Sequence, residues 1–199
     1  MTSRSAIVCL LATALAATAC DKASPGNGQA DANAASSAAS SDEVTASAPP
    51  AGTRADKVDR SHKGEAAPDV AFTSADGKPA TLAGYRGKPL LVNLWATWCA
   101  PCVKEMPTLN TAAAALGDRV RVIAVSQDME PAKATAFFAE RRLPALALHL
   151  DSKLALSTAY AANLPTTILY GADGKEIWRV TGDLDWTGAQ AKGLLAEAG

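Results

Sequence analysis

The stretch Trp95-Ala-Thr-Trp-Cys-Ala-Pro-Cys-Val-Lys-Glu-Met-Pro107 decides the fold, because its two cysteines fall between a strand and a helix. Residues 88–95 form an almost continuous apolar run, which is typical of a strand buried on both faces. Residues 100–116 are expected to form a helix. Cys99 and Cys102 could hold a metal, cross-link a loop or exchange electrons, and the rest of the sequence must separate these alternatives.

The chain from Pro68 onward alternates strands with helices. A hairpin is expected over 69–82 with its turn at Asp76-Gly77. Further strands are expected at 119–125, 146–150, 166–170 and 176–180, and further helices at 130–142, 152–162 and from about residue 186. Gly171-Ala-Asp-Gly174 lies between the last two strands and indicates a hairpin. This order predicts an α/β domain whose mixed central sheet is covered by helices on both faces.

The N-terminus has the pattern of a secretory signal. Arg4 precedes an apolar stretch over 6–19, which is shorter than the roughly 20 residues needed to cross a bilayer. Ala17-Thr-Ala-Cys20 resembles a bacterial lipoprotein box, in which Cys20 would be lipidated, although such boxes usually begin with Leu. An ordinary signal peptidase could also cut there. We expect a signal peptide over 1–19 of the lipoprotein type, with plain secretion as the alternative, and a domain that works outside the cytoplasm.

Residues 20–65 are expected to be a disordered tether between the membrane and the domain. From 21 to 65 there are eleven Ala and seven Ser, and no aromatic residue. Such a segment buries too little apolar surface to offset the entropy lost on ordering. The domain is therefore expected over 66–199. The chain has a net charge of −1 and no basic face, which argues against a nucleic-acid partner.

Counting the cysteines narrows their role. Cys9 lies inside the expected signal and Cys20 is the expected lipidation site, so the domain keeps only Cys99 and Cys102. A disulfide that closes so short a loop stabilises a fold very little, which argues against a cross-link. Structural zinc needs four ligands, and the sequence offers no second pair.

Copper delivery remains the alternative to redox chemistry, because soft thiolates bind Cu(I). Copper chaperones of similar architecture, however, space their cysteines more widely and add a histidine ligand downstream. His149 is the one histidine within 66–199, and it ends an apolar strand, where a structural role is expected. No cofactor or resident metal is expected.

The position of Cys99 favours redox chemistry. A cysteine at a helix N-terminus lies beside unpaired backbone N–H groups and the positive end of the helix dipole, and both stabilise a thiolate. Pro101 suits the first turn, where its missing N–H is not needed. Cys102, one turn further on, can attack a mixed disulfide formed at Cys99. We expect Cys99 to be the attacking thiol and Cys102 the resolving one.

Other residues near the pair are given separate interpretations. Glu105 lies three residues beyond Cys102, on roughly the same helix face, so it either handles protons for the cysteines or is a solvated surface side chain. Trp95, Met106 and Met129 are expected to pack in the interior.

Three motifs resemble the thioredoxin superfamily. They are Trp98-Cys-Ala-Pro-Cys102 after a strand, Pro107 within the following helix, and Leu164-Pro165-Thr166 before a strand. The signal with its tether, the N-terminal hairpin and the added strand–helix before Pro165 resemble a narrower group, the membrane-anchored TlpA/ResA-like thiol-disulfide oxidoreductases. The related CcmG/DsbE branch carries Gly-x-Pro-Glu at this proline, whereas this chain has Asn163-Leu-Pro-Thr-Thr167.

The resemblance implies roles for particular residues. Pro165 would be the cis-proline beside the dithiol, with a simple turn proline as the alternative. The backbone of Leu164 would then pair with an extended substrate, and Trp98, Leu164 and Thr166 would bind it. Asn93 stands where thioredoxin has a buried aspartate. Glu105 stands where ResA-like proteins have a glutamate that tunes the cysteines.

The expected activity is reduction of protein disulfides in an oxidising compartment. Pro101 and Ala100 offer the thiolate few hydrogen-bond donors, and a less stabilised thiolate goes with a more reducing couple. The resemblance implies a membrane electron donor of the DsbD/CcdA type. It also implies apocytochrome c or the copper-site cysteines of an oxidase as substrates, without choosing between them. The protein is expected to be a monomer, anchored through its lipid.

Overall fold

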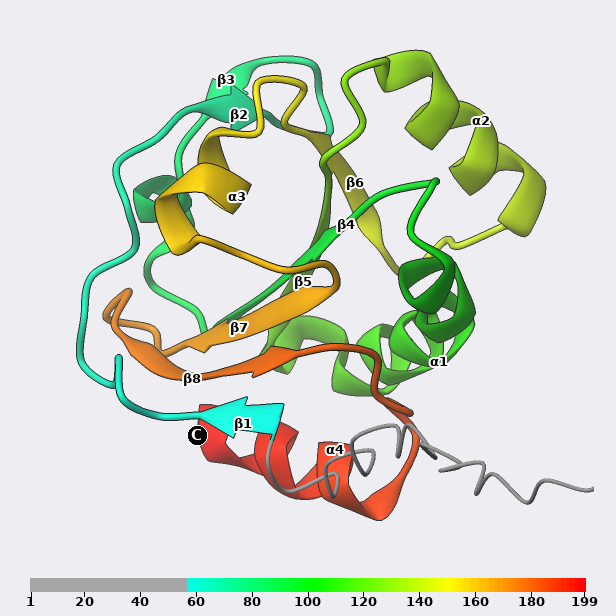
Figure 1. Ribbon diagram of the computed structural model, residues 1–199. Coiled ribbons are helices and arrows are strands. Elements are labelled where there is room, and N and C mark those ends of the chain that lie inside the picture. The colour runs from blue at the N-terminus through cyan, green and yellow to red at the C-terminus, as the bar shows by residue number, and fades with distance from the viewer. Residues whose placement is uncertain (1–56) are drawn as a thin grey trace, which may run out of the picture. The chain divides into compact units, whose positions relative to one another are not determined.

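An eight-stranded sheet runs through residues 57–199, the part of the chain that this computed structural model describes (Figure 1). The strands are β1 Val58–Asp59, β2 Phe72–Thr73, β3 Pro79–Ala80, β4 Leu90–Trp95, β5 Arg121–Ser126, β6 Ala147–Leu150, β7 Thr166–Tyr170 and β8 Glu176–Thr181. Their order in the sheet is β1-β8-β7-β4-β5-β6-β2-β3. β4, β5 and β6 are parallel, and β7 runs antiparallel to both β4 and β8.

Helices cover both faces of this sheet. They are α1 Ala100–Leu116, α2 Pro131–Arg141, α3 Ala155–Tyr160 and α4 Ala189–Leu195, with short 3-10 turns at Leu82–Tyr85, Gly117–Arg119 and Ala196–Ala198. Buried side chains of α1, α2 and α4 share one core cluster. The turn at 82–85, the β2–β3 hairpin and α3 share the cluster on the opposite face. No described helix is long and apolar enough to cross a membrane.

The central strand β4 places the active-site helix. All six of its residues are buried, and alternate side chains point to opposite faces. Leu91 and Trp95 join the cluster beneath α1, whereas Val92 and Leu94 join the cluster beneath α3. Asn93 is in phase with Leu91 and Trp95, so its polar side chain is directed into the α1 side.

The expected fold class is confirmed. The hairpin over 69–82 forms β2 and β3, and the added strand–helix forms β6 and α3, with β6 joining the sheet between β5 and β2. The last helix begins at Ala189 rather than near 186. The reason is a turn over Asp185–Gly188, closed by a 3.0 Å hydrogen bond from the Gly188 N–H to the Asp185 carbonyl.

The expected domain boundary at residue 66 was wrong. Val58 pairs with Val180 and Asp59 with Arg179, so β1 adds an edge strand within the range expected for the tether. Val58 also packs against the core cluster beneath α1. A two-residue strand gives too weak a composition signal to be recognised. The predicted signal peptide, Cys20 and the tether up to residue 56 lie outside the described residues.

Candidate active site

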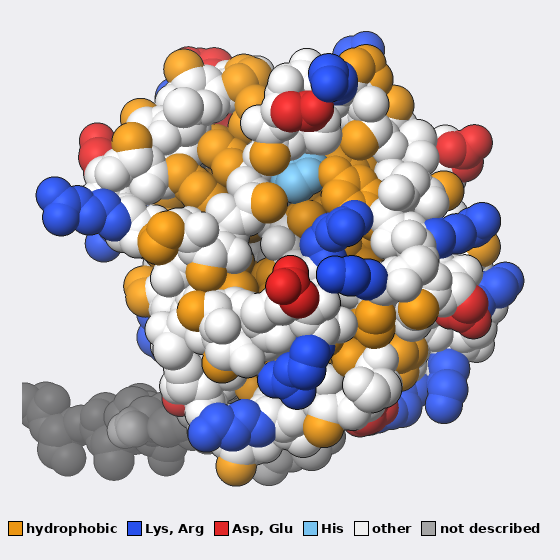
Figure 2. Space-filling view, turned by 180° about the vertical axis from the view of Figure 1, so that it is seen from behind, with side chains coloured by type: hydrophobic (Ala, Val, Ile, Leu, Met, Phe, Trp, Pro, Cys, Tyr) orange, Lys and Arg blue, Asp and Glu red, His pale blue; other side chains and the backbone are white. Residues whose placement is uncertain are grey.

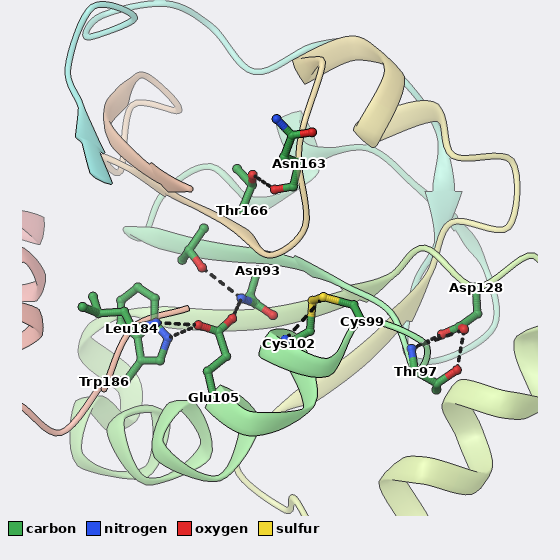
Figure 3. The surroundings of a disulfide bond; sticks show 11 residues. Asn93, Thr97, Cys99, Cys102, Glu105, Asp128, Asn163, Thr166, Leu184 and Trp186 are labelled. Atoms are coloured by element: carbon green, nitrogen blue, oxygen red, sulfur yellow. Dashed lines mark hydrogen bonds between the residues drawn. A yellow bond between two sulfur atoms is a disulfide. The ribbon is translucent and has the colours of Figure 1, made fainter. Parts of the chain in front are cut away.

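Cys99 and Cys102 form a disulfide at the N-terminus of α1 (Figure 3). Cys99 is the N-cap residue, with extended backbone angles, and its sulfur accepts a hydrogen bond from the Cys102 N–H at 3.3 Å. The Cys99 residue keeps 6% of its surface exposed, and Cys102 has none. A partner sulfur can therefore approach only the Cys99 end of the disulfide.

The first turn of α1 gives the Cys99 sulfur limited support. Pro101 lies within that turn and has no N–H to donate, so the backbone donor to this sulfur is the Cys102 N–H. The positive end of the helix dipole adds a favourable field. The environment thus favours a thiolate at Cys99. A residue other than proline at position 101 would add one more backbone N–H in this turn.

Asp128 holds the turn that leads into Cys99. Its carboxylate accepts hydrogen bonds from the Thr97 N–H at 3.1 Å and from the Thr97 hydroxyl at 2.6 Å. The Ser126 hydroxyl donates to the same carboxylate at 2.8 Å. Asp128 is buried, and it joins the end of β5 to the end of β4 (Figure 3). Sequence reasoning missed this contact, because nothing local to Asp128 shows which backbone it will meet.

Replacing Asp128 with alanine is expected to destabilise the domain by about 1–3 kcal/mol, because the buried Ser126 hydroxyl and the Thr97 N–H would lose their acceptor. Urea unfolding followed by circular dichroism measures the effect. Glu130→Ala is the matched control, since Glu130 is exposed and its ion pair with Lys133 is at the surface. That variant should change stability by less than about 0.5 kcal/mol. Equal stability of the two variants would contradict the role given to Asp128.

Two large apolar side chains are exposed beside this turn. Trp98 is 69% exposed and Met129 is 75% exposed. They directly follow Thr97 and Asp128, the pair joined by the hydrogen bonds above. The expectation for Trp98 was contact with a substrate, and its exposure leaves it free for that role. The expectation that Met129 packs in the interior was wrong, because the chain turns outward between β5 and α2. Trp95 and Met106 are fully buried, as expected.

Glu105 is buried on the inner face of α1, with 2% of its surface exposed. It accepts hydrogen bonds from Asn93 Nδ2 at 2.8 Å, the Leu184 N–H at 3.1 Å and Trp186 Nε1 at 3.2 Å (Figure 3). Burial raises its pKa from 4.5 to about 7, although the three hydrogen bonds act to lower it. The interpretation of Glu105 as a solvated surface side chain was wrong. Its carboxyl can change protonation state near neutral pH.

The partners of Glu105 come from segments distant in sequence. Leu184 and Trp186 lie between β8 and α4, 79 and 81 residues away. Sequence reasoning missed both. A buried indole N–H needs an acceptor, so Trp186 carried a weak signal for a nearby polar group. Leu184 carried none, because its contribution is a backbone N–H.

The peptide bond between Leu164 and Pro165 is cis, as the resemblance implied. Leu164 is partly buried and packs against both core clusters. Figure 3 shows the segment between Asn163 and Thr166 bending toward the disulfide. The expected role of Thr166 in substrate binding stays a prediction, and its side chain has a structural role. It is buried at the start of β7, and its hydroxyl donates to the Asn163 carbonyl at 2.6 Å, so its side chain holds this segment in place.

The histidines of the described region are used structurally. His149 is buried, its Nδ1 lies 3.1 Å from the Ala147 carbonyl and its Nε2 lies 2.6 Å from the Tyr85 hydroxyl. His62, which the expected boundary had excluded from the domain, contacts Glu65 at the surface. Among residues 57–199 no group of three or more His, Cys, Asp or Glu side chains is arranged to hold a metal ion.

Comparison with known proteins agrees with this geometry. Residues 62–195, more than half of the chain, match the Redoxin family model. The chain is 34% identical over 123 residues to the thiol-disulfide oxidoreductase ResA of Geobacillus thermodenitrificans, an alignment that covers 61% of this chain and 70% of the relative. It is 32% identical over 134 residues to ResA of Bacillus cereus, which covers 66% of this chain and 76% of the relative.

Solved structures give the same result. A Chlorobium tepidum protein assigned as the thiol:disulfide interchange protein DsbE superposes with a TM-score of 0.60 and 28% identity, covering 69% of this chain and 98% of that one. StoA of Bacillus subtilis shares the fold with a TM-score of 0.54 and 22% identity, covering 63% of this chain and 95% of that one.

A thioredoxin-like fold with a Cys-x-x-Cys disulfide at a helix N-terminus defines a class of protein-disulfide oxidoreductases. The chain belongs to the Redoxin family, and its relatives place it with the ResA-like thiol-disulfide oxidoreductases.

Proposed function

We propose that the protein reduces disulfides of substrate proteins outside the cytoplasm, with Cys99 as the attacking thiol. The observation that carries this proposal is the unequal burial of the pair. Cys99 reaches the surface at the N-terminus of α1, whereas Cys102 is fully enclosed above the buried Glu105. An accessible nucleophile and an enclosed resolving thiol are what a two-step exchange requires.

The cycle transfers two electrons from the dithiol to the substrate. The Cys99 thiolate attacks one sulfur of the substrate disulfide, which forms a mixed disulfide and releases the other substrate sulfur as a thiolate. Cys102 then loses its proton and attacks the Cys99 sulfur. The second substrate sulfur leaves, and the Cys99–Cys102 disulfide forms. Glu105 accepts the proton of Cys102 in this proposal, because its pKa of about 7 suits a base at neutral pH.

The surface beside Cys99 suits an extended polypeptide substrate. Trp98 offers an exposed apolar side chain on one side. The cis peptide at Leu164–Pro165 offers backbone on the other, where Leu164 would pair with the substrate. Both roles extend the family resemblance to this chain.

The setting is proposed from the N-terminal sequence and the relatives together. Cys20 carries a lipid that anchors the protein at the periplasmic side of a bacterial membrane, and residues 20–56 link it to the domain as a tether. A membrane carrier of the DsbD/CcdA type returns electrons to the pair. The substrates are cysteine pairs that must stay reduced, such as those of apocytochrome c or an oxidase copper site. The protein acts as a monomer.

The reduction potential of the Cys99–Cys102 pair tests the direction. Limited donor support at Cys99 predicts a reducing couple near thioredoxin's roughly −270 mV. The measurement equilibrates the protein with dithiothreitol or glutathione buffers and quantifies the two thiols by alkylation. Substitution of Pro101 by histidine, which adds an N–H and a polar side chain, should make the couple more oxidising.

A measured potential near DsbA's roughly −120 mV would overturn the reductase assignment and indicate an oxidase instead. Failure of the pair to equilibrate with any thiol buffer would contradict a redox function. Copper delivery by the same two cysteines would then be the favoured alternative.

A further inference from the structure

The side chain of Asn93 is fully buried beneath the disulfide and only half satisfied. Its Nδ2 donates to Glu105 Oε1 at 2.8 Å and to the Thr167 hydroxyl at 2.9 Å. Its Oδ1 has no hydrogen-bond partner, and it is one of three such buried side-chain atoms within residues 57–199. Figure 3 shows this oxygen on the side of Asn93 that faces Cys102, away from Glu105.

The orientation of the Asn93 amide follows from its partners. Turning it over would direct Oδ1 at Glu105, and with Glu105 ionised two acceptors would then face each other. While Glu105 is ionised, the free oxygen therefore remains on the side of Cys102. A buried carbonyl oxygen without a donor is unfavourable, because it has lost its hydrogen bonds to water and gained none, so natural proteins keep few of them.

The oxidation state explains why this oxygen lacks a donor. In the disulfide neither sulfur carries a hydrogen. Reduction to a Cys99 thiolate and a Cys102 thiol adds two electrons and one proton to the pair, and the protonated Cys102 gains an S–H group, which is a hydrogen-bond donor. Cys102 is enclosed, so no water competes for that donor from outside.

We propose that Asn93 Oδ1 accepts the hydrogen bond of the Cys102 thiol in the reduced protein. Reduction then satisfies an acceptor that oxidation leaves without a partner, so Asn93 shifts the equilibrium toward the dithiol. The inference rests on the proposed function in one respect, namely that the pair cycles between the two states.

The hydrogen bond also distributes the protons of the reduced pair. The thiol proton is held at Cys102, and Cys99 is left as the thiolate under the influence of the helix dipole. The same amide that accepts from Cys102 donates to Glu105, so Asn93 links the resolving thiol to the carboxyl by two hydrogen bonds. A substrate therefore meets only the Cys99 thiolate as a nucleophile. Cys102 becomes a nucleophile only when its proton is removed.

The S–H stretching band in the infrared spectrum tests this directly. The full chain with Cys99, Cys9 and Cys20 replaced by serine keeps Cys102 as its one thiol. A band shifted to lower frequency than that of a free thiol is expected, as for a thiol that donates a hydrogen bond. Introducing Asn93→Leu should return the band to the position of a free thiol. A free band with Asn93 present, or a band that Asn93→Leu leaves in place, would overturn the proposal.

The redox equilibrium gives an independent readout. In the otherwise unmodified chain, Asn93→Leu should shift the equilibrium with dithiothreitol about tenfold toward the disulfide, which equals about 30 mV for a two-electron couple. Thr167→Val is the matched control, since it removes the other partner of Asn93 and leaves Oδ1 intact, and it should shift the equilibrium less than twofold. Equal shifts in both variants would contradict the proposal.

These results are distinguishable from a failure of the proposed function. The infrared band reports a hydrogen bond whether the protein acts as reductase or oxidase. A reduction potential that refutes the reductase assignment would not alter the position of the S–H band. An S–H band at the position of a free thiol would refute the hydrogen bond to Asn93 but not the reductase assignment.

Discussion

Replacing Cys99 with serine is expected to abolish disulfide reduction, with a loss of more than about a thousandfold in turnover of a disulfide-containing protein such as insulin. The hydroxyl of serine is a far weaker nucleophile at neutral pH, and the enclosed Cys102 cannot replace it, because none of its surface reaches a substrate. Turbidity of reduced insulin measures the loss.

Replacing Cys102 with serine has a different expected result. Cys99 can still attack, so the variant should accumulate a mixed disulfide that non-reducing gel electrophoresis and mass spectrometry detect. Cys20→Ser is the matched control, since it removes a cysteine far from the pair in sequence, and it should reduce insulin at the normal rate. Mixed disulfides at Cys102 in the Cys99→Ser variant, or none in Cys102→Ser, would reverse or refute the assigned roles.

Much of the fold could be predicted because its signals are local. The apolar run of β4, the hairpin turn at Asp76-Gly77 and the Cys-x-x-Cys motif each lie within a few consecutive residues, and all three form as expected. β1 has no such local signal. Its two residues gain their place only by pairing with Val180 and Arg179, which lie about 120 positions away.

The candidate site divides in the same way. The position of Cys99 follows from the junction of strand and helix, and helix spacing places Glu105 on the face of Cys102, because positions three apart share a face, but spacing left open whether Glu105 is buried. The partners of Glu105 do not, since a backbone N–H at Leu184 has no sequence signature. The burial of the Thr166 side chain could not be predicted either, because adjacency to Pro165 in sequence does not say which way that side chain points. Exposure is equally non-local, and Met129 looks no different in sequence from the buried Met106.

Replacing Glu105 with glutamine is expected to slow the resolving step by about a hundredfold, because an amide cannot accept the proton of Cys102. In the unmodified protein, that step should accelerate as pH rises through about 7, where Glu105 ionises, and then level off. The variant should lose this inflection. Single-turnover decay of a preformed mixed disulfide, followed from pH 5 to 9, measures both. Glu130→Gln, an exposed acid, is the control and should behave like the unmodified protein.

Glu105→Gln slows the resolving step but is expected to raise the free energy of unfolding at neutral pH. Unfolded Glu105 titrates near 4.5 and the folded residue near 7, so between these values unfolding releases a proton. The Glu105 contribution to unfolding free energy therefore falls as pH rises from about 4.5 to 7, by at most on the order of 3 kcal/mol, and is constant above. Burial lowers the pKa of His149 below its ordinary value of 6.5, which gives an opposing rise in stability as the pH increases toward 6.5.

Comparing the variant with the unmodified protein isolates the Glu105 contribution, because His149 is common to both. Urea unfolding at several pH values should show Glu105→Gln gaining stability relative to the unmodified protein as pH increases, up to about pH 7. A variant that lost stability equally at every pH would mean that Glu105 is a structural acceptor which stays ionised. Slow resolution together with a stability gain at pH 8 would instead show that the fold keeps a destabilising buried carboxyl because the chemistry of Cys102 requires it.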